Sequence, residues 1–273
     1  MLRRLCPVFA CSLLGLFAAC GDSDPTENPA FDAGNGGGEA DADTTPKSFE
    51  TLIEGTWTKA PGSDSYHCVW LNVQEDIYIT GFDALAPAGT HHTVLSVSDN
   101  YTGPNKQESC GVGDMADQML YASGVGTGAL DMPAGVALKV SAGQTLMLNL
   151  HLFNISDNEI SGTSGTLVTT TTADKVEHLA EYIFAGPIPI YTIPGDGQDF
   201  QASGGCTMPT DGKVFALWPH MHQTGKHIVM SHSGVTVLDE PFDFNEQKMY
   251  PVTEFAVKAG EKVNVTCTWN NTG

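Results

Sequence analysis

The chain has 273 residues and a formal net charge of −20 at pH 7, because 32 acidic side chains outnumber 12 basic ones. Binding to nucleic-acid phosphates requires a basic face, so nucleic acid is not expected as a partner. The length allows one large domain or two ordinary ones.

The N-terminus has the pattern of a secretory signal peptide, expected over residues 1–19. A basic start is followed by an apolar run, Leu5 to Ala19, that is too short for a permanent membrane span. Residues 17–21 resemble a bacterial lipobox, in which Cys20 is lipidated; the alternative is an ordinary signal cleaved near Ala19. We therefore expect an exported protein that is lipid-anchored to the bacterial outer membrane or cell surface, or else secreted.

Residues 20–48 are rich in Asp, Glu, Gly, Pro, Asn and Thr and contain almost nothing to bury. Such a segment cannot offset the entropy lost on ordering, so it is expected to be a disordered acidic linker. Any contact with the membrane would then be made only through the lipid anchor.

After residue 48, short alternating runs of apolar and polar residues recur between turn signals. They predict an all-β protein made of antiparallel sandwiches. A helical turn is expected at residues 174–182, and the prolines after Ala185 favour a passage between an N-terminal domain, 49–180, and a C-terminal domain, 181–273. The strand-like runs are 66–73, 76–80, 93–97, 146–151, 165–170, 227–231 and 262–268.

Four cysteines lie beyond the signal region, two on each side of the expected domain boundary. Outside the cytosol they are expected to be oxidised. The simplest disulfide in the first half joins Cys68 to Cys110. A pairing of Cys206 with Cys267 stays open.

His220 and His222 form a His-x-His motif directly after the apolar run 212–218. Side chains two positions apart on a strand share a face, so the two imidazoles are expected to point to the same side. Taken alone, the motif is more often a pair of histidines on a solvated strand face than half of a metal site.

Two further contexts contain histidines. His91 and His92 follow a turn and open the strand-like run 93–97, and adjacent residues can share a metal only where the backbone bends. His151 ends the run 146–151 on the face of Met147 and Asn149; a third ligand and a plain surface histidine fit this position equally. Ordinary surface or hydrogen-bonded roles are expected for the other histidines outside these contexts, His67, His178, His227 and His232.

Three segments, Gly89–Leu95, Leu148–Asn154 and Pro219–Lys226, together resemble the copper type II, ascorbate-dependent monooxygenases in their order and separation. That family includes peptidylglycine α-hydroxylating monooxygenase and dopamine β-monooxygenase. The resemblance covers residues 49–273. It implies two antiparallel jelly-roll-like β-sandwich domains in tandem, each holding one copper ion on facing walls of a solvent-filled cleft.

The resemblance also implies a set of site residues. The first copper would be held by His91, His92 and His151, and the second by His220, His222 and a methionine thioether. A C–H bond of a small organic substrate would be hydroxylated with O2 and ascorbate or a similar reductant. The oxygen would be activated at the catalytic His220/His222 site, and the second electron would come from the first site. The pair Cys68–Cys110 also matches a disulfide of the family.

Two features depart from the family. The methionine ligand and the partner of Cys267 follow the segment 262–273 in the family, and no residue here matches them. The C-terminal domain is therefore expected to be truncated, or the second site to be defective, and activity of this chain stays open. Trp218 stands where the peptide-amidating branch has an arginine that grips a peptide carboxylate, so a glycine-extended peptide is not expected as the substrate.

Two other functions stay open from the sequence. One is a non-catalytic copper-binding surface lipoprotein with the same fold, and the other is an adhesive β-sandwich. Measuring the copper content of the purified protein would separate the three functions. A monooxygenase should bind about two copper ions per chain, a non-catalytic copper-binding protein one, and an adhesive protein none.

Overall fold

The computed structural model describes residues 48–124, 126–187, 192–244 and 246–272. The predicted signal peptide, the predicted lipidation site Cys20 and the linker up to residue 47 lie outside the described residues. Within the described ranges the chain is almost entirely β-strand, with one 3-10 helix, Ala173–Lys175. No helix in this part of the chain is long and apolar enough to cross a membrane.

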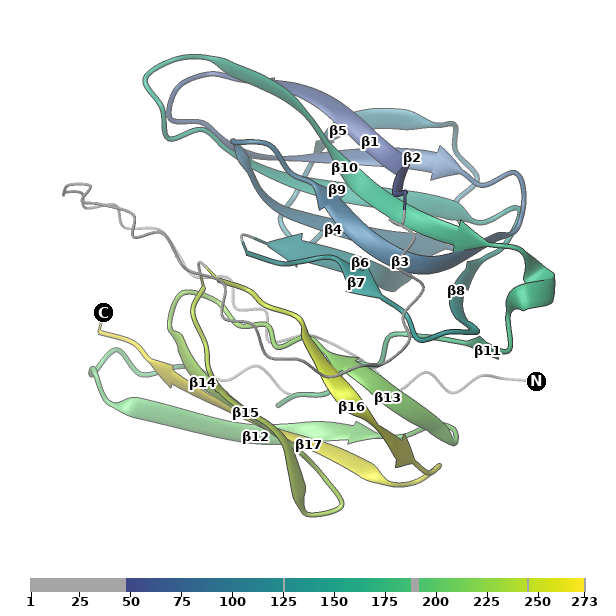
Figure 1. The fold of residues 1–273 in the computed structure, drawn as a ribbon. Helices are drawn as coiled ribbons and strands as arrows, with labels where there is room; N and C mark the ends of the chain where they lie inside the picture. The colour runs from purple at the N-terminus through teal and green to yellow at the C-terminus, as the bar shows by residue number, and fades with distance from the viewer. Residues whose placement is uncertain (1–47, 125, 188–191, 245, 273) are drawn as a thin grey trace, which may run out of the picture.

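The first half of the described chain forms a β-sandwich of two sheets (Figure 1). One sheet has the strand order β1-β10-β3-β8-β11, with β7 paired to β3, and the other has the order β5-β2-β9-β4-β6. Neighbouring strands are antiparallel except for the parallel pair β8 and β11. The strands are β1 (Glu50–Lys59), β2 (Asp64–Asn72), β3 (Ile77–Leu85), β4 (Thr90–Ser98), β5 (Lys106–Cys110), β6 (Gln118–Gly124), β7 (Leu130–Asp131), β8 (Val136–Val140), β9 (Thr145–Phe153), β10 (Ile160–Thr171) and β11 (His178–Leu179).

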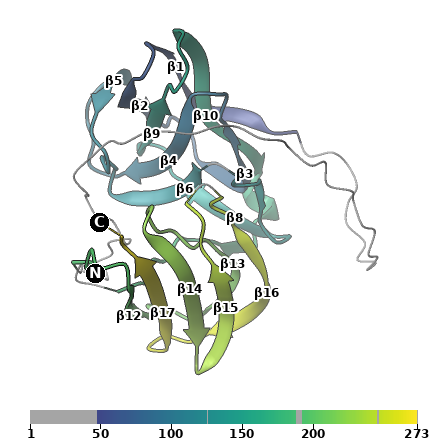
Figure 2. The ribbon, with the colours of Figure 1, turned by 90° about the vertical axis from the view of Figure 1, so that its left-hand side faces the viewer.

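The second half forms a smaller sandwich, in which a four-stranded sheet with the order β12-β17-β14-β15 lies opposite the pair β13-β16. Its strands are β12 (Asp199–Thr207), β13 (Gly212–Leu217), β14 (Gly225–His232), β15 (Val235–Pro241), β16 (Tyr250–Val257) and β17 (Lys262–Asn270). The two sandwiches lie one above the other, and β6 of the first lies near the second (Figures 1 and 2). The all-β, antiparallel sandwich fold predicted from the sequence is confirmed.

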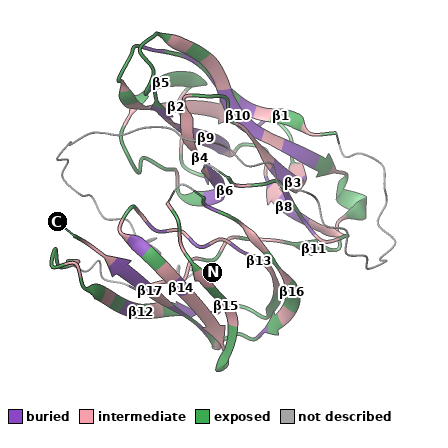
Figure 3. Ribbon diagram, turned by 60° about the vertical axis from the view of Figure 1, so that its left-hand side comes forward, coloured by how far each residue is buried: buried purple, intermediate pink, exposed green. Residues whose placement is uncertain are grey.

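The alternation of side chains along β9 explains how the first core forms. Leu146, Leu148 and Leu150 are fully buried between the two sheets, and their burial stabilises the fold by about 2–3 kcal/mol each. β9 is buried on both faces from Thr145 to Leu150, and Figure 3 marks the buried segments of the strands in purple. His151 lies near the C-terminal end of β9, on the opposite face from these leucines and beside the buried Asn149.

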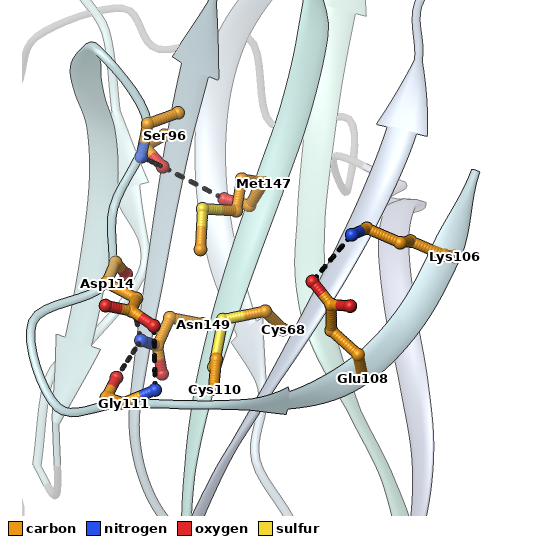
Figure 4. Close-up of a disulfide and its surroundings, with 10 residues drawn as sticks. Cys68, Ser96, Lys106, Glu108, Cys110, Gly111, Asp114, Met147 and Asn149 are labelled. Atoms are coloured by element: carbon orange, nitrogen blue, oxygen red, sulfur yellow. Dashed lines mark hydrogen bonds and ion pairs between the residues drawn. A yellow bond between two sulfur atoms is a disulfide. The ribbon is translucent and has the colours of Figure 1, made fainter. Parts of the chain in front are cut away.

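A disulfide joins Cys68 of β2 to Cys110 of β5, as predicted (Figure 4). Next to it, Asn149 of β9 donates hydrogen bonds to the carbonyl oxygens of Gly111 and Asp114. The covalent bond and the amide together hold the segment after β5 against the outer face of the sheet that carries His151.

Replacing both Cys68 and Cys110 with alanine is expected to lower the free energy of unfolding by about 4 kcal/mol. The disulfide closes a loop with a sequence separation of 42, and loop-closure entropy in the unfolded chain gives this magnitude. Chemical denaturation with and without a reductant measures it. The reductant should destabilise the unmodified protein and leave the double variant unchanged; equal stability of the two proteins would contradict the prediction.

Two other expectations are decided by the fold. Cys206 faces Val263 and Cys267 faces Ala202 across the β12–β17 pair, so the two cysteines are four positions apart in register, too far to be bridged.

The helical turn expected at 174–182 is wrong beyond Lys175, where the 3-10 helix ends.

The chain becomes extended there because the backbone N–H groups of Glu177 and His178 both donate to the Gly135 carbonyl oxygen. This contact starts the parallel pairing of β11 with β8.

Candidate metal centre

A bulge at the start of β4 brings two adjacent histidines to one side of the sheet. Thr90 pairs with Leu152 and His92 pairs with His151. Two residues of β4 therefore lie opposite one residue of β9, and His91 is the additional residue. A bulge of this kind turns the extra side chain away from the regular alternation. Adjacent histidines can share a metal ion only where the backbone bends, and this bulge provides the bend at His91 and His92.

His91, His92 and His151 form a compact group, which we call the first histidine cluster. The Nδ1 atom of His92 lies 3.1 Å from Nδ1 of His91 and 3.3 Å from Nδ1 of His151. One potential ligand atom from each of the three residues lies within 4.8 Å of the others. The convergence predicted from positions far apart in the sequence is thus present in the structure.

The first histidine cluster fits a transition-metal ion. Two ligand atoms that are each about 2 Å from one ion lie about 3 Å apart at angles near the tetrahedral value. Ligation requires a neutral imidazole, and burial, followed by the neighbouring histidines, lowers the pKa of His92 to about 2. Burial is also the main cause that lowers the pKa of His91. A donor set of three imidazoles suits zinc, copper, iron or nickel better than magnesium or calcium.

His220 and His222, which we call the second histidine pair, lie with ring centroids 5.2 Å apart. The expectation that they share a face of a strand is wrong, because β13 ends at Leu217 and both histidines follow it in irregular structure. Pro219 has no N–H to donate to a neighbouring strand, which explains why the pairing stops. Met221 between them is fully buried in the second core, facing away from the imidazoles as expected.

The side chain of Gln247 connects the two histidine groups. Its Oε1 accepts a hydrogen bond from Nδ1 of His220 at 2.8 Å, and its Nε2 lies 3.2 Å from Nε2 of His92. Gln247 is 1% exposed, and Gly124, which pairs with His92, leaves the space that this amide needs. The amide oxygen can only accept and the amide nitrogen can only donate, so in this orientation Nδ1 of His220 carries a proton and Nε2 of His92 accepts one hydrogen bond.

Phe244 lies beside the same histidines. Its ring centroid is 5.5 Å from that of His91, 5.8 Å from that of His92 and 6.3 Å from that of His222. The resemblance implies a solvent-filled cleft between the two sites, but between His92 and His220 the structure has the buried side chain of Gln247 instead. The side chains of the two sandwiches meet directly at the two histidine groups.

The second histidine pair is also neutral at physiological pH. Burial, followed by the charge of His220, lowers the pKa of His222 to about 4, and burial lowers the pKa of His220. Both imidazoles can therefore offer a lone pair to a metal ion. The Nδ1–H group of His220 points to Gln247, so its Nε2 carries the free lone pair.

The other described histidines have local partners or an exposed position. His67 hydrogen-bonds to Lys59, His227 pairs with Asp239, and His232 pairs with Glu261. His178 is exposed on the short strand β11. The ordinary roles predicted for these four agree with their positions.

The metal-free protein is expected to lose stability as pH falls below about 6.5. The folded pKa values of His91, His92, His220 and His222 lie below the unfolded value, so below it the unfolded chain binds protons that the folded chain does not. Each such histidine costs up to about 1.4 kcal/mol per pH unit. Urea unfolding at a series of pH values measures the slope. A variant in which His220 and His222 are both alanine should show a shallower slope, and equal stability above and below about pH 6.5 would contradict the prediction.

Comparisons with known proteins leave the family undetermined. No protein-family model matches the chain, and no curated protein sequence matches it. Among solved structures, the chain is similar to vicilin from Solanum lycopersicum (tomato), with 8% identity, 80% of this chain and 74% of that chain covered, and a TM-score of 0.15. A similarity this low carries no argument about function.

Proposed function

We propose that this protein is a copper-dependent monooxygenase. It would hydroxylate a C–H bond of a small organic substrate with O2 and a one-electron reductant such as ascorbate. The observation that supports this most is the approach of two histidine groups from the two sandwiches. His91, His92 and His151 form one group, His220 and His222 form the other, and the amide of Gln247 contacts one member of each, His92 and His220. The choice of copper among the metals that suit imidazole comes from the resemblance of the histidine segments to copper type II monooxygenases.

The arrangement matches the electron count of such a reaction. Hydroxylation combines R–H, O2, two electrons and two protons into R–OH and water, and copper, when bound, supplies one-electron redox chemistry and O2 activation. Two one-electron sites could supply these two electrons in one turnover, with the external reductant restoring both afterwards. The first histidine cluster would hold one ion and the second histidine pair the other, with Gln247 as a hydrogen-bonded connection between them.

The surroundings of the second histidine pair favour a neutral, partly apolar substrate. The Trp218 ring centroid lies 5.8 Å from that of His220, and the buried Trp218 Nε1–H has no hydrogen-bond partner within the described part of the chain. Phe244 adds a second aromatic ring near His222. An aromatic or aliphatic substrate with one acceptor atom for the indole N–H would satisfy both features.

We also propose that the protein acts outside the cytosol, held by a lipid on Cys20. The basic and apolar start of the sequence and the small residues before Cys20 support this. The disulfide Cys68–Cys110 agrees with an oxidising compartment.

The test is incubation of the copper-loaded chain with ascorbate, isotopically labelled O2 and a panel of small aromatic and aliphatic compounds. Mass spectrometry should find one labelled oxygen atom in the hydroxylated product. Free copper with ascorbate at the same concentration is the control, because it generates oxidants without protein. Products equal to those of free copper would favour the non-catalytic copper-binding protein, and absence of copper binding would favour the adhesive sandwich.

A further inference from the structure

A carboxylate lies directly behind one member of the first histidine cluster. Oδ1 of Asp64, the first residue of β2, lies 2.7 Å from Nε2 of His151 in the neighbouring β9. The side chain of Asp64 is 39% exposed, whereas that of His151 is 14% exposed. The contact therefore joins an accessible carboxylate to the outer edge of a largely covered imidazole.

This contact determines which nitrogen of His151 faces the cluster. An ionised carboxylate can only accept hydrogen bonds, so Nε2 of His151 must carry the proton that it donates to Asp64. Nδ1, which lies 3.3 Å from Nδ1 of His92, is then the atom with the free lone pair. The metal-binding atom of His151 is thereby selected before any metal arrives.

Tyr66 fixes the plane of the same imidazole. Tyr66 pairs with His151 in the β2–β9 register, and the two rings stack with centroids 4.4 Å apart and an interplanar angle of 7°. Asp64 lies two residues earlier on the same face of β2, so one strand holds the edge of the ring through Asp64 and its face through Tyr66. Rotation of the His151 ring would break both contacts.

We propose that Asp64 is a positioning residue for the first histidine cluster, which locks His151 in the Nε2–H tautomer and directs Nδ1 toward the metal. A carboxylate behind a ligating histidine also makes the imidazole a stronger donor. A stronger nitrogen donor favours Cu(II) over Cu(I), so Asp64 adapts the first copper site to give up an electron. The effect on the copper potential rests on the proposed function, because it assumes that copper occupies the first histidine cluster. The selection of the His151 tautomer does not depend on that assumption.

Nitrogen NMR of the metal-free protein tests the lock without reference to copper. In the unmodified chain, His151 is expected to show a single Nε2–H tautomer at about pH 8. Asp64→Ala should convert it to a mixture of tautomers, whereas Asp239→Ala, which removes the comparable partner of His227, should leave His151 unchanged. A protonated Nδ1 in the unmodified chain, or an unchanged tautomer in Asp64→Ala, would overturn the proposal.

Copper affinity and reduction potential test the effect on the metal. Asp64→Asn keeps an acceptor atom but removes the charge, and it should weaken Cu(II) binding by about 10–100-fold, with a smaller loss for Cu(I). A tenfold difference between the two losses corresponds to a rise in potential of about 59 mV.

Asp239→Asn is the control for a charge change beside a histidine outside the cluster. If Asp64→Asn and Asp239→Asn have equal copper affinities and equal reduction potentials, Asp64 does not tune the copper site. If the unmodified chain binds no copper at the first histidine cluster, both this tuning effect and the proposed function are wrong. The NMR experiment would still show whether Asp64 fixes the tautomer of His151.

Discussion

Replacing His92 with alanine is expected to reduce the copper bound by the protein from two ions per chain to one. His92 is the middle member of the first histidine cluster, since its Nδ1 lies 3.1 and 3.3 Å from the two neighbouring Nδ1 atoms. Loss of a direct ligand should exceed the effect of losing a hydrogen-bonded neighbour of a ligand, so we expect at least about a 100-fold loss of affinity. Competition with a coloured chelator measures it.

The matched control for this variant is His227→Ala. His227 is also a strand histidine with a carboxylate partner, Asp239, but lies outside both histidine groups. It should bind two ions with unchanged affinity. If His92→Ala binds copper as tightly as His227→Ala, the first histidine cluster is not a copper site.

Replacing His222 with alanine is expected to remove the copper ion that the second histidine pair would hold, together with any protein-dependent hydroxylation that the chain performs. Only two described histidines, His220 and His222, supply this site, and one remaining imidazole cannot hold the ion against competing chelators. The first histidine cluster should keep its copper, because its ligands lie on β4 and β9 of the other sandwich. Product analysis with labelled O2, together with copper analysis, measures both effects.

Gln223→Ala is the control for the His222 variant, since Gln223 is the next residue and its side chain is exposed. It should bind two ions and form the same product as the unmodified chain. Equal product formation by His222→Ala and Gln223→Ala would show that the second histidine pair has no part in the chemistry.

Much of the fold could be predicted because apolar residues at every second position indicate a strand with one face packed against a core. The runs at 146–151 and 262–268 lie within β9 and β17, where alternate residues face a core. β12 was not predicted, because its Gly and Ser residues give no apolar alternation. The short β11 depends on backbone contacts with Gly135, which composition does not encode.

The first histidine cluster was predictable in part, since a turn before His91 and His92 suggested the bend that the bulge supplies. The position of the second histidine pair was predicted less well. The apolar run before Trp218 suggested a strand through His222, and Pro219 was the signal that the strand ends earlier.

The residues that support the histidines were missed for different reasons. Asp64 and Tyr66 lie on the same face of β2 as Cys68, and that spacing offered a signal once β2 was assigned. Their contact with His151 depends on the β2–β9 register, which the sequence does not specify. Gln247 and Phe244 offered no local signal, because they meet His92 across the contact between the two sandwiches.

The most direct test of the two-copper account is a count of copper ions per chain, with the donor atoms identified by X-ray absorption. We expect two ions in the unmodified chain, with nitrogen donors at about 2 Å. We expect one ion in His92→Ala, one in His222→Ala and none when both residues are replaced. A chain that binds no copper, or whose copper content is the same in all four proteins, would contradict the assignment of two copper sites.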